Sequence, residues 1–250
     1  MKQKTISLVK GKGSISHNNR DFVAKNVDEE RIKWNTVFVT EPLEVAYEKC
    51  FKKALDDYNK KQTRTDRKKD DYMSEIRHSK NGEKLFYENI VQIGDMHDTA
   101  VLDDENYCSD DAEVAEEILK KYAETFQERN PHLYVFNCVL HMDEATPHLH
   151  IDYIPVATGY TRGMETRNSL SKALQQQGIP KAKNKKLNET KMWQDREREY
   201  LTKLAKERDI EIVIKGEEKR PYLHVEEYKK AMRKVDELKV EISDKESVLE

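Results

Sequence analysis

The chain alternates short apolar runs with longer amphipathic stretches, a pattern that indicates strands and helices together. Runs rich in β-branched and aromatic residues predict strands at residues 3–9, 33–40, 84–94, 133–140, 148–156 and 211–215. Apolar positions that recur at helical spacing predict one helix that follows Pro42 as far as Tyr58, and others at residues 110–129, 168–177 and 189–208. Residues 60–71 are basic and have no apolar period, so we expect a mobile segment there.

The two strands at residues 133–140 and 148–156 are close enough in sequence to form a hairpin. In this hairpin His141 lies opposite His148, and directly opposed residues point to the same face of a sheet. His150 is two residues from His148, so it shares that face, together with Asn137 and Asp152. The other face is continuous and apolar; it comprises Tyr134, Phe136, Cys138, Leu140, Leu149, Ile151 and Tyr153.

The apolar face of this hairpin needs a covering helix, and the stretch 110–129 is the nearest candidate. One side of that helix carries Val114, Ile118, Leu119, Tyr122 and Phe126. The acidic residues of its first turn favour the N-terminus of a helix electrostatically. We therefore expect one face of the hairpin to belong to the hydrophobic core and the other to carry polar chemistry.

The chain changes character near its end. A heptad pattern with a single charged interruption, Lys239, predicts a coiled coil; it comprises Val225, Tyr228, Met232, Val235, Ile242 and Leu249. The expected organisation is a first domain at residues 1–215, followed by the start of a helical region at residues 216–250. The coiled coil makes a homodimer a possible assembly.

Composition narrows the class of protein. Charged residues make up 37% of the 250 residues, and glycine and proline are scarce at 8 and 6, which is typical of a helix-rich α/β or α+β protein. No apolar run has the length of a membrane span, and the N-terminus does not resemble a signal peptide. The three cysteines are far apart and form no C-x-x-C pair, so we expect free thiols and a reduced, cytoplasmic setting.

The net charge of −3 hides strongly charged segments. Residues 52–69 hold eight Lys and Arg against three Asp, and residues 181–191 hold five Lys against one Glu. Residues 103–117 hold eight acidic side chains and no basic one. The basic segments can serve either as solvated surface or as contacts for a polyanion.

The three histidines of His141–His150 form a candidate metal site. Burying three imidazoles without partners would leave polar groups unsatisfied, whereas a metal would satisfy them. Three neutral imidazoles leave coordination positions open, as in catalytic rather than closed structural sites. Zn, Mn, Fe, Co and Ni all accept such ligands, so the pattern does not select the metal. Asp143 and Glu144 follow in the connecting loop, where they can orient a ligand or a reacting group.

The pattern H-x-D-E-x-T-P-H-x-H at His141–His150 resembles the metal motif of the HUH superfamily of single-strand DNA nickases, and within it the Mob/Pre plasmid mobilisation relaxases. A second motif of that family, H-N-x-R, matches His17-Asn18-Asn19-Arg20, and Asn35 in KWNTVF is a weaker third match. The resemblance implies an α+β fold in which a central antiparallel sheet with flanking helices holds the metal. It also implies nicking of one DNA strand at an origin of transfer, with a covalent 5′-phosphate adduct that is later rejoined.

The resemblance assigns roles residue by residue. It implies that His17 attacks the phosphate, that Arg20 contacts a phosphate or the active-site carboxylate, and that Glu144 orients or deprotonates His17. Asn18 and Asn35, together with Asp143, would shape the site. The implied cofactor is a divalent ion held by His141, His148 and His150, with Mn²⁺ or Mg²⁺ expected. The implied partner is DNA, as a hairpin plus single strand, and the candidate contacts are Lys60, Lys61, Arg64, Arg67, Lys68, Lys69, Lys181, Lys183, Lys185 and Lys186.

Other interpretations stay open at this point. Tyr47 and Tyr87 compete with His17 as the attacking group, since the chain has twelve tyrosines. A cupin-like metal oxygenase also carries H-x-H on a strand, but the scarcity of glycine and the long helices argue against it. A non-enzymatic DNA-binding or coiled-coil protein with a structural metal is the remaining alternative.

Overall fold

The computed structural model describes residues 1–182, 184, 187–213 and 234. All elements named below lie within one unit, Met1–Ile214. The expected coiled coil, and the homodimer through it, concern a segment that, apart from Lys234, lies outside the described residues. Lys183, Lys185 and Lys186 lie outside them as well.

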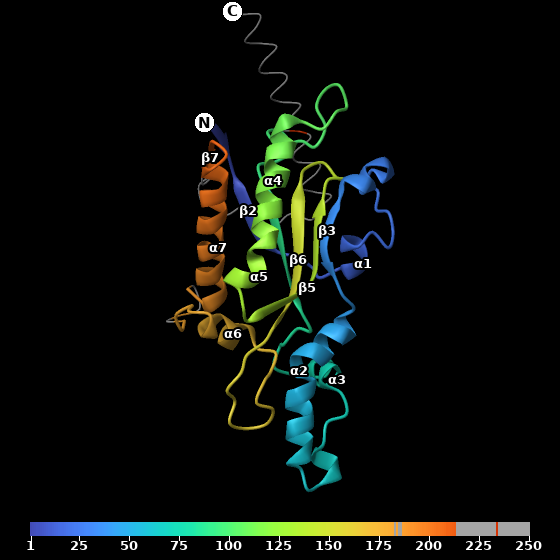
Figure 1. Cartoon of the computed structure of the whole chain (residues 1–250), viewed down its shortest axis with the longest axis vertical. Helices are drawn as coiled ribbons and strands as arrows, with labels where there is room; N and C mark the ends of the chain where they lie inside the picture. Colours follow the sequence, from blue (N-terminus) through green and yellow to red (C-terminus); the bar gives the residue numbers. More distant parts are fainter. Residues whose placement is uncertain (183, 185–186, 214–233, 235–250) are drawn as a thin grey trace, which may run out of the picture. The chain divides into compact units, whose positions relative to one another are not determined.

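The centre of the described fold is a five-stranded antiparallel sheet (Figure 1). Its strand order is β2 (Ile6–Lys10), β4 (Tyr87–Ile93), β6 (His148–Pro155), β5 (Leu133–His141) and β3 (Thr36–Thr40). The pairing places His141 opposite His148, as the hairpin pattern predicts. The α+β class with a central antiparallel sheet is therefore confirmed, and this open sheet differs from the strand-rich barrel of a cupin.

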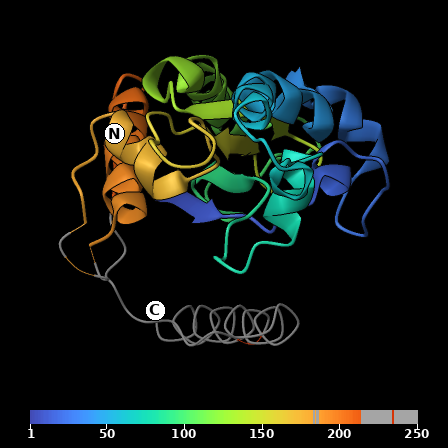
Figure 2. The same cartoon turned by 90° about the horizontal axis from the view of Figure 1, so that it is seen from below.

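Three helices cover one face of the sheet: α4 (Asp110–Glu124), α5 (Phe126–Arg129) and α7 (Glu189–Lys206). Figures 1 and 2 show α4 and α7 side by side on this face. The amphipathic stretch at residues 110–129 is confirmed as the covering element, although Thr125 divides it into two helices. The short helix α6 (Leu170–Gln176) packs beside α7. The core between these layers contains Leu119, Tyr122, Leu149, Ile151 and Trp193, all fully buried.

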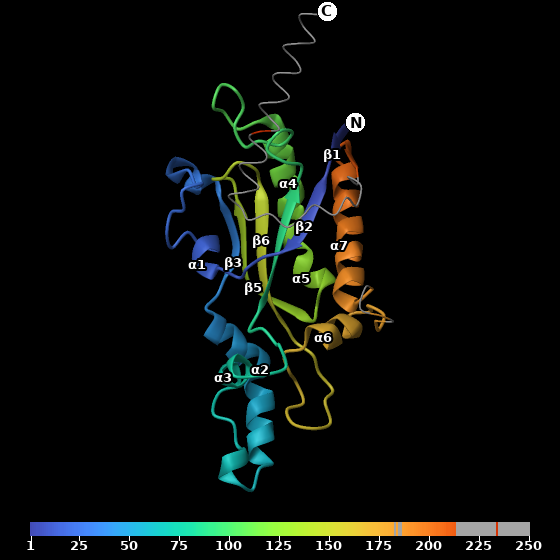
Figure 3. The same cartoon turned by 180° about the vertical axis from the view of Figure 1, so that it is seen from behind.

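A second apolar cluster lies at one end of the sheet, where α2 (Leu43–Lys60) and α3 (Tyr72–Arg77) pack (Figure 3). The prediction that Tyr134 and Phe136 share a face with Cys138 is wrong. A β-bulge between Val135 and Asn137 shifts the register, and both aromatic side chains join the α2–α3 cluster instead. A bulge inserts one unpaired residue, so the inward and outward sides exchange beyond it.

Several element boundaries also differ from the prediction. The expected strand at residues 3–9 divides at Thr5 into β2 and a separate strand, β1 (Lys2–Lys4), which pairs in parallel with β7 (Ile210–Ile212). The expected strand at residues 33–40 begins only at Thr36, because a 3₁₀ helix (Glu29–Trp34) precedes it. The basic segment 60–71 contains a 3₁₀ turn at Thr65–Arg67. Among the described residues no helix has both the length and the apolarity needed to cross a membrane.

Candidate active site

Three imidazoles converge at the paired ends of β5 and β6. The ring centroids of His141 and His150 are 4.6 Å apart, those of His148 and His150 are 5.0 Å apart, and those of His141 and His148 are 5.2 Å apart. All three side chains are buried or nearly so. The predicted convergence on one face of the hairpin is therefore confirmed.

Each imidazole has one ring nitrogen within hydrogen-bond distance of an oxygen that can only accept. His141 Nε2 lies 2.8 Å from the backbone oxygen of Asn18, and His148 Nδ1 lies 2.8 Å from that of Thr146. His150 Nδ1 lies 2.6 Å from Glu88 Oε1. Because a carbonyl or carboxylate oxygen accepts, these three nitrogens must carry the protons. The lone pairs then reside on His141 Nδ1, His148 Nε2 and His150 Nε2.

These lone pairs fit a divalent cation. Two of the nitrogens, His141 Nδ1 and His150 Nε2, are buried and have no hydrogen-bond partner among the described residues. Burial, reinforced by the neighbouring histidines, lowers the pKa of His141 to about 2, and burial likewise lowers the pKa of His148 to about 4. Both rings are therefore neutral at physiological pH, as metal coordination requires. A buried imidazole nitrogen without a partner is costly unless an ion or a substrate completes it.

Glu88 on β4 is a site residue that the sequence analysis missed. Its side chain is 2% exposed, and it lies opposite Asp152 in the sheet. Burial alone would raise the pKa of this carboxyl, but hydrogen bonds from His150 and the Gly13 amide lower it below its usual value. An ionised carboxylate behind an imidazole fixes its tautomer and increases its basicity as a ligand. The sequence signal for Glu88 is an acidic residue within the largely apolar run LFYENIVQI, where a buried and therefore partnered carboxylate is expected.

A buried polar network continues from Glu88 under the imidazoles. The Asn18 side chain donates to Glu88 Oε1 and to Asp152 Oδ2, each at 2.9 Å, and Asn137 donates to Asp152 at 2.9 Å. The Gly13 amide donates to Glu88 Oε2 at 2.6 Å. The backbone passes so close that a Cβ at Gly11 would stand 1.9 Å from Glu88 Oε2, so only glycine fits there.

His17 lies beside the cluster on α1 (Ile15–Asn18). Its ring centroid is 5.8 Å from that of His150 and 6.0 Å from that of His141. The His17 side chain is 26% exposed, whereas the three histidines of the cluster are buried. Its Nε2 is 3.5 Å from Glu144 Oε1. Burial and the nearby Arg20 charge lower its pKa, so the ring is neutral at pH 7 and can act as a nucleophile.

Ligand-type atoms fall into two overlapping sets within 4.8 Å: His17 with His141 and His150, and Glu144 with His141 and His148. His141 belongs to both sets, so an ion in either lies against the same imidazole. The greater exposure of His17 suits a group that must meet a substrate. All five of these side chains belong to the two sequence motifs.

Arg20 connects the H-N-x-R motif to the histidine motif at residues 141–150 through hydrogen bonds. Its Nε and one terminal nitrogen donate to both oxygens of Asp143, at 2.7 and 2.6 Å, and the same terminal nitrogen donates to Glu144 at 2.9 Å. Its other terminal nitrogen donates to the His17 backbone oxygen at 2.9 Å. Although burial opposes it, the hydrogen bonds from Arg20 and Asn35 lower the pKa of Asp143. The guanidinium therefore fixes where His17 stands relative to the histidine hairpin.

Asn35 and Asp143 support the hairpin loop rather than a histidine ring. The prediction that Asn35 lies on a strand is wrong, because it follows the 3₁₀ helix as its C-cap and precedes β3. Its side chain donates to Asp143 Oδ2 at 2.6 Å and accepts from the Met142 amide at 2.7 Å. Asp143 in turn holds Arg20, so both residues position the loop that presents Glu144.

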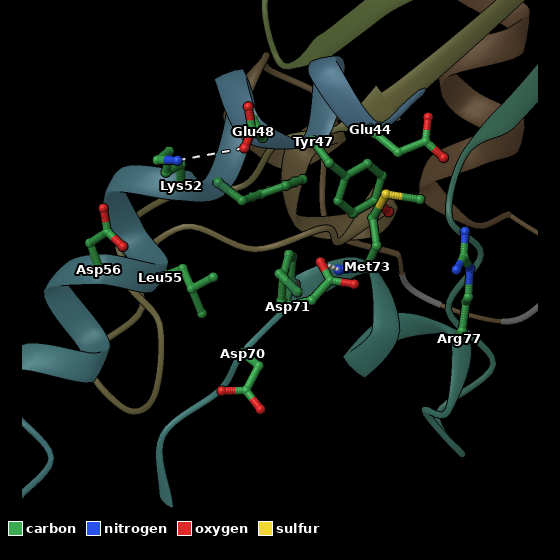
Figure 4. Close-up of a pocket in the computed structure, with 12 residues that line it drawn as sticks. Glu44, Tyr47, Glu48, Lys52, Leu55, Asp56, Asp70, Asp71, Met73 and Arg77 are labelled. Atoms are coloured by element: carbon green, nitrogen blue, oxygen red, sulfur yellow. Dashed lines mark hydrogen bonds and ion pairs between the residues drawn. The ribbon is translucent and has the colours of Figure 1, made fainter. Parts of the chain in front are cut away.

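An open hollow of about 290 Å³ lies over this site and is lined by His17, Ile90, Gln92, Glu144, Ala145, Thr146, His148 and His150. A different hollow of about 410 Å³ lies between α2 and α3 (Figure 4). Its lining is rich in carboxylates, including Glu44, Asp56 and Asp70, and contains no histidine. Such a lining repels a polyanion, so the histidine hollow is the better candidate for chemistry on DNA.

The structure does not bring the rival tyrosines to the cluster. The Tyr47 hydroxyl is buried in the second core, where it donates to the Leu85 backbone oxygen at 2.6 Å. Tyr87 lies opposite Tyr153, on the face of β4 that points away from Glu88 and His150. Neither phenol is placed to attack a group bound at the imidazoles.

The predicted basic contacts stand apart from the histidine cluster. Residues 60–69 form the far end of α2 and the turn after it, and most of their cationic side chains are exposed. Several are paired, as Arg64 is with Asp66. Lys181 is exposed in the loop that precedes α7.

We predict that replacing Glu88 by Gln weakens metal binding. The neutral amide no longer increases the basicity of His150, and loss of such a partner typically lowers metal affinity about 10- to 100-fold. Isothermal titration of the metal-free protein with Mn²⁺ measures this. Glu165→Gln is the matched control, because this glutamate is exposed and its hydrogen-bond partners, Gly159 and Thr166, do not belong to the site. Equal affinities for Glu88→Gln and wild type would contradict the role of Glu88.

We also predict that the metal-free protein loses stability as the pH falls from about 6.5 to about 4, relative to His148→Gln. The folded-state pKa of His148 is about 4, below its ordinary value of 6.5, so in this window the unfolded chain binds the proton and the folded chain does not. Each pH unit then costs about 1.4 kcal/mol of unfolding free energy per histidine. Urea unfolding with a chelator present measures the difference, and parallel pH profiles for the two proteins would refute it.

Comparison with known proteins places these observations in a family. The family model of Mob_Pre, the plasmid recombination enzymes, matches residues 41–230. No curated protein matches the chain. Among solved structures, a Mn-bound MobM relaxase domain with a 22-nucleotide strand of plasmid pMV158 oriT DNA is 18% identical, covering 91% of this chain and 99% of that one, with a TM-score of 0.50. Another structure of the same domain with a 23-nucleotide strand is 23% identical, covering 92% and 98%, with a TM-score of 0.47.

The family model spans most of the chain and includes the histidine hairpin, with Glu144 in its loop. The H-N-x-R motif at His17–Arg20 precedes the matched range, and the structure brings it to the hairpin through Arg20. The chain belongs to the Mob_Pre family of plasmid recombination enzymes.

Proposed function

We propose that this chain is a metal-dependent DNA relaxase. It nicks one strand at an origin of transfer of a plasmid or mobile element, remains joined to the 5′ phosphate, and later rejoins the strand. Membership in the Mob_Pre family supports this activity, as does the likeness in fold to a relaxase domain that is bound to Mn and to oriT DNA. The expected cofactor is Mn²⁺ or Mg²⁺, and the expected substrate is a DNA hairpin with an adjoining single strand.

One observation carries the proposal: a neutral, partly exposed imidazole stands beside three buried imidazoles whose ring centroids lie 4.6–5.2 Å apart. His17 supplies the first: its side chain is 26% exposed, and it lines the same hollow as His148 and His150. A structural metal site would need no such neighbour, and its ligands would enclose the ion. The arrangement therefore favours an enzyme over a non-enzymatic metal protein.

The reaction conserves the energy of the phosphodiester bond. The lone pair of the His17 ring attacks phosphorus, so an N–P bond forms while the P–O3′ bond breaks. The imidazole then carries a positive charge, and its other ring nitrogen releases a proton to the departing 3′ oxygen. Glu144 Oε1 lies 3.5 Å from His17 Nε2, so it can relay that proton when Nδ1 forms the bond to phosphorus. Reversal of these steps rejoins the strand without ATP. A divalent ion at the three imidazoles would polarise the scissile phosphate and neutralise its developing charge.

The remaining residues hold this geometry. Arg20 keeps His17 and Glu144 in register with Asp143, and Asn35 fixes the loop between the two metal-binding strands. Asn18 supports His141 through its backbone oxygen and Glu88 through its side chain. A shift of about 1 Å in such a site can cost two orders of magnitude in rate, so these positions matter although they do not react.

Sequence-independent DNA affinity would come from cationic side chains. The proposed phosphate contacts at the far end of α2 and in the turn after it are Lys60, Lys61, Arg64, Arg67, Lys68 and Lys69. Further proposed contacts are Lys181 and, later in the sequence, Lys183, Lys185 and Lys186. We place the nicking activity in residues 1–215, with residues 216–250 as the start of a helical region, and we expect the enzyme to act in the cytoplasm.

We predict that His17→Ala abolishes the covalent adduct, whereas Tyr47→Phe and Tyr87→Phe keep it. The reason is that, of these three residues, His17 alone lines the histidine hollow. Supercoiled plasmid that carries the cognate origin is incubated with Mn²⁺, and mass spectrometry then locates the protein–DNA bond. His148→Ala should lose nicking as well as bound metal.

The outcome separates the parts of the proposal. An adduct that persists in His17→Ala would show that another group attacks. Full nicking and full metal content in His148→Ala would remove the metal site from the mechanism. No strand-specific nicking by the wild-type protein would reject the relaxase assignment itself.

A further inference from the structure

A third hollow lies on the other side of Glu88 from His150. It has a volume of about 340 Å³, within the range of roughly 300–1,000 Å³ that small-molecule sites occupy. Its wall comprises residues 10–13, where β2 ends, and residues 84–88 at the start of β4, with Tyr153 behind them. The sequence motifs do not include this segment, and the proposed chemistry leaves the hollow unused.

The rim of this hollow is cationic. Lys10, Lys12 and Lys84 line it, and all three are exposed. No carboxylate among the described residues forms a salt bridge with any of these three ammonium groups, whereas lysines such as Lys53, Lys120 and Lys191 each have an acidic partner. Three unpaired ammonium groups around one hollow attract an anion.

The only acidic group that lines the hollow is already engaged within the described structure. Glu88 accepts hydrogen bonds from His150 and Asn18 at Oε1 and from the Gly13 amide at Oε2, and it is 5% exposed. Its charge is therefore directed at the imidazole cluster and the glycine loop. The lysines determine the electrostatic character of the opening.

Aromatic side chains, Phe86, Tyr87 and Tyr153, also line the hollow. Phe86 is half-buried and packs edge-on against Phe136, and Tyr87 stacks on Tyr153 with an interplanar angle of 18°. Aromatic rings beneath a cationic rim are the combination that single-stranded nucleic acid requires, because bases stack on rings while phosphates meet lysines. Glu88 lines this hollow and lies 2.6 Å from His150, which lines the histidine hollow, so one strand can contact both.

We propose that this hollow is a nucleotide subsite. It receives one nucleotide of the single-stranded DNA beside the scissile phosphate, with the phosphate among Lys10, Lys12 and Lys84 and the base against Phe86. The inference rests on the proposed relaxase function and adds to it a position where the strand is held before and after cleavage.

The test measures strand binding without nicking. A mixed-sequence single strand of about 20 nucleotides, with 2-aminopurine at one position in each of a series of strands, is titrated into the wild-type protein in the presence of a chelator. We expect strong fluorescence quenching at one position only, where the base stacks. Phe86→Leu should abolish that quenching and weaken binding about five- to a hundredfold.

Charge is tested separately. Lys10→Ala/Lys12→Ala and Lys84→Ala should reduce the slope of log affinity against log salt by about 0.7 for each phosphate that is no longer neutralised by a lysine. Lys203→Ala/Lys206→Ala is the matched control, because these lysines are exposed on α7 and do not line the hollow. The control should bind like the wild type.

The outcomes distinguish this inference from the function on which it rests. If the wild type nicks plasmid while the lysine and Phe86 variants bind the strand like the control, the subsite is wrong and the relaxase function stands. If free deoxythymidine monophosphate binds as tightly as the strand, the hollow serves a free nucleotide, and the DNA subsite is wrong. If the wild type neither nicks plasmid nor binds the strand, both proposals fall.

Discussion

The contact between Arg20 and the carboxylates of Asp143 and Glu144 is the interaction on which the site depends. It joins segments that are 123 residues apart in the chain. Arg20 adopts a left-handed backbone conformation, with φ of 58°, which costs roughly 1–2 kcal/mol for a residue with a side chain. A bidentate guanidinium–carboxylate pair offsets that cost, and it directs the preceding turn of chain, with His17, over the imidazole cluster.

The burial of this contact makes it a rigid one. The Arg20 side chain is 6% exposed and that of Asp143 is 0% exposed. Removal of one partner from a buried ion pair leaves an uncompensated charge, at a cost of about 3–5 kcal/mol. The pair therefore acts as a requirement for the local fold as well as for the chemistry, because neither motif is placed correctly without the other.

The site also depends on a network of buried polar side chains next to the imidazoles. Glu88, Asn18, Asp152 and Asn137 form a connected chain of hydrogen bonds. Burial raises the pKa of Asp152 to about 6 despite the amides that donate to it. Such a network specifies one arrangement when it is satisfied, and is costly when it is not. The α4–α7 layer supplies the apolar packing on the opposite face of the same strands.

The sequence predicts the parts of this structure that follow from local periodicity. The strand alternation around His141, His148 and His150 places three imidazoles on one face, and helix 110–129 is recognisable from its apolar stripe. The bulge at Phe136 cannot be predicted from the sequence, because an extra residue in a strand leaves no local pattern. The role of Glu88 depends on β4 pairing with β6, a choice of neighbour that no local pattern encodes. Asn35 was misplaced because a β-rich run, KWNTVFVT, hides the end of a 3₁₀ helix.

The central claim is that the protons on three imidazoles are held by oxygen acceptors, so that the opposite nitrogens meet at one cation. Diffraction from crystals grown with Mn²⁺, collected at the manganese absorption edge, tests it most directly. We expect one anomalous peak bonded to Nδ1 of His141 and to Nε2 of both His148 and His150. A peak bonded through His141 Nε2, or the absence of any peak at these imidazoles, would contradict the claim.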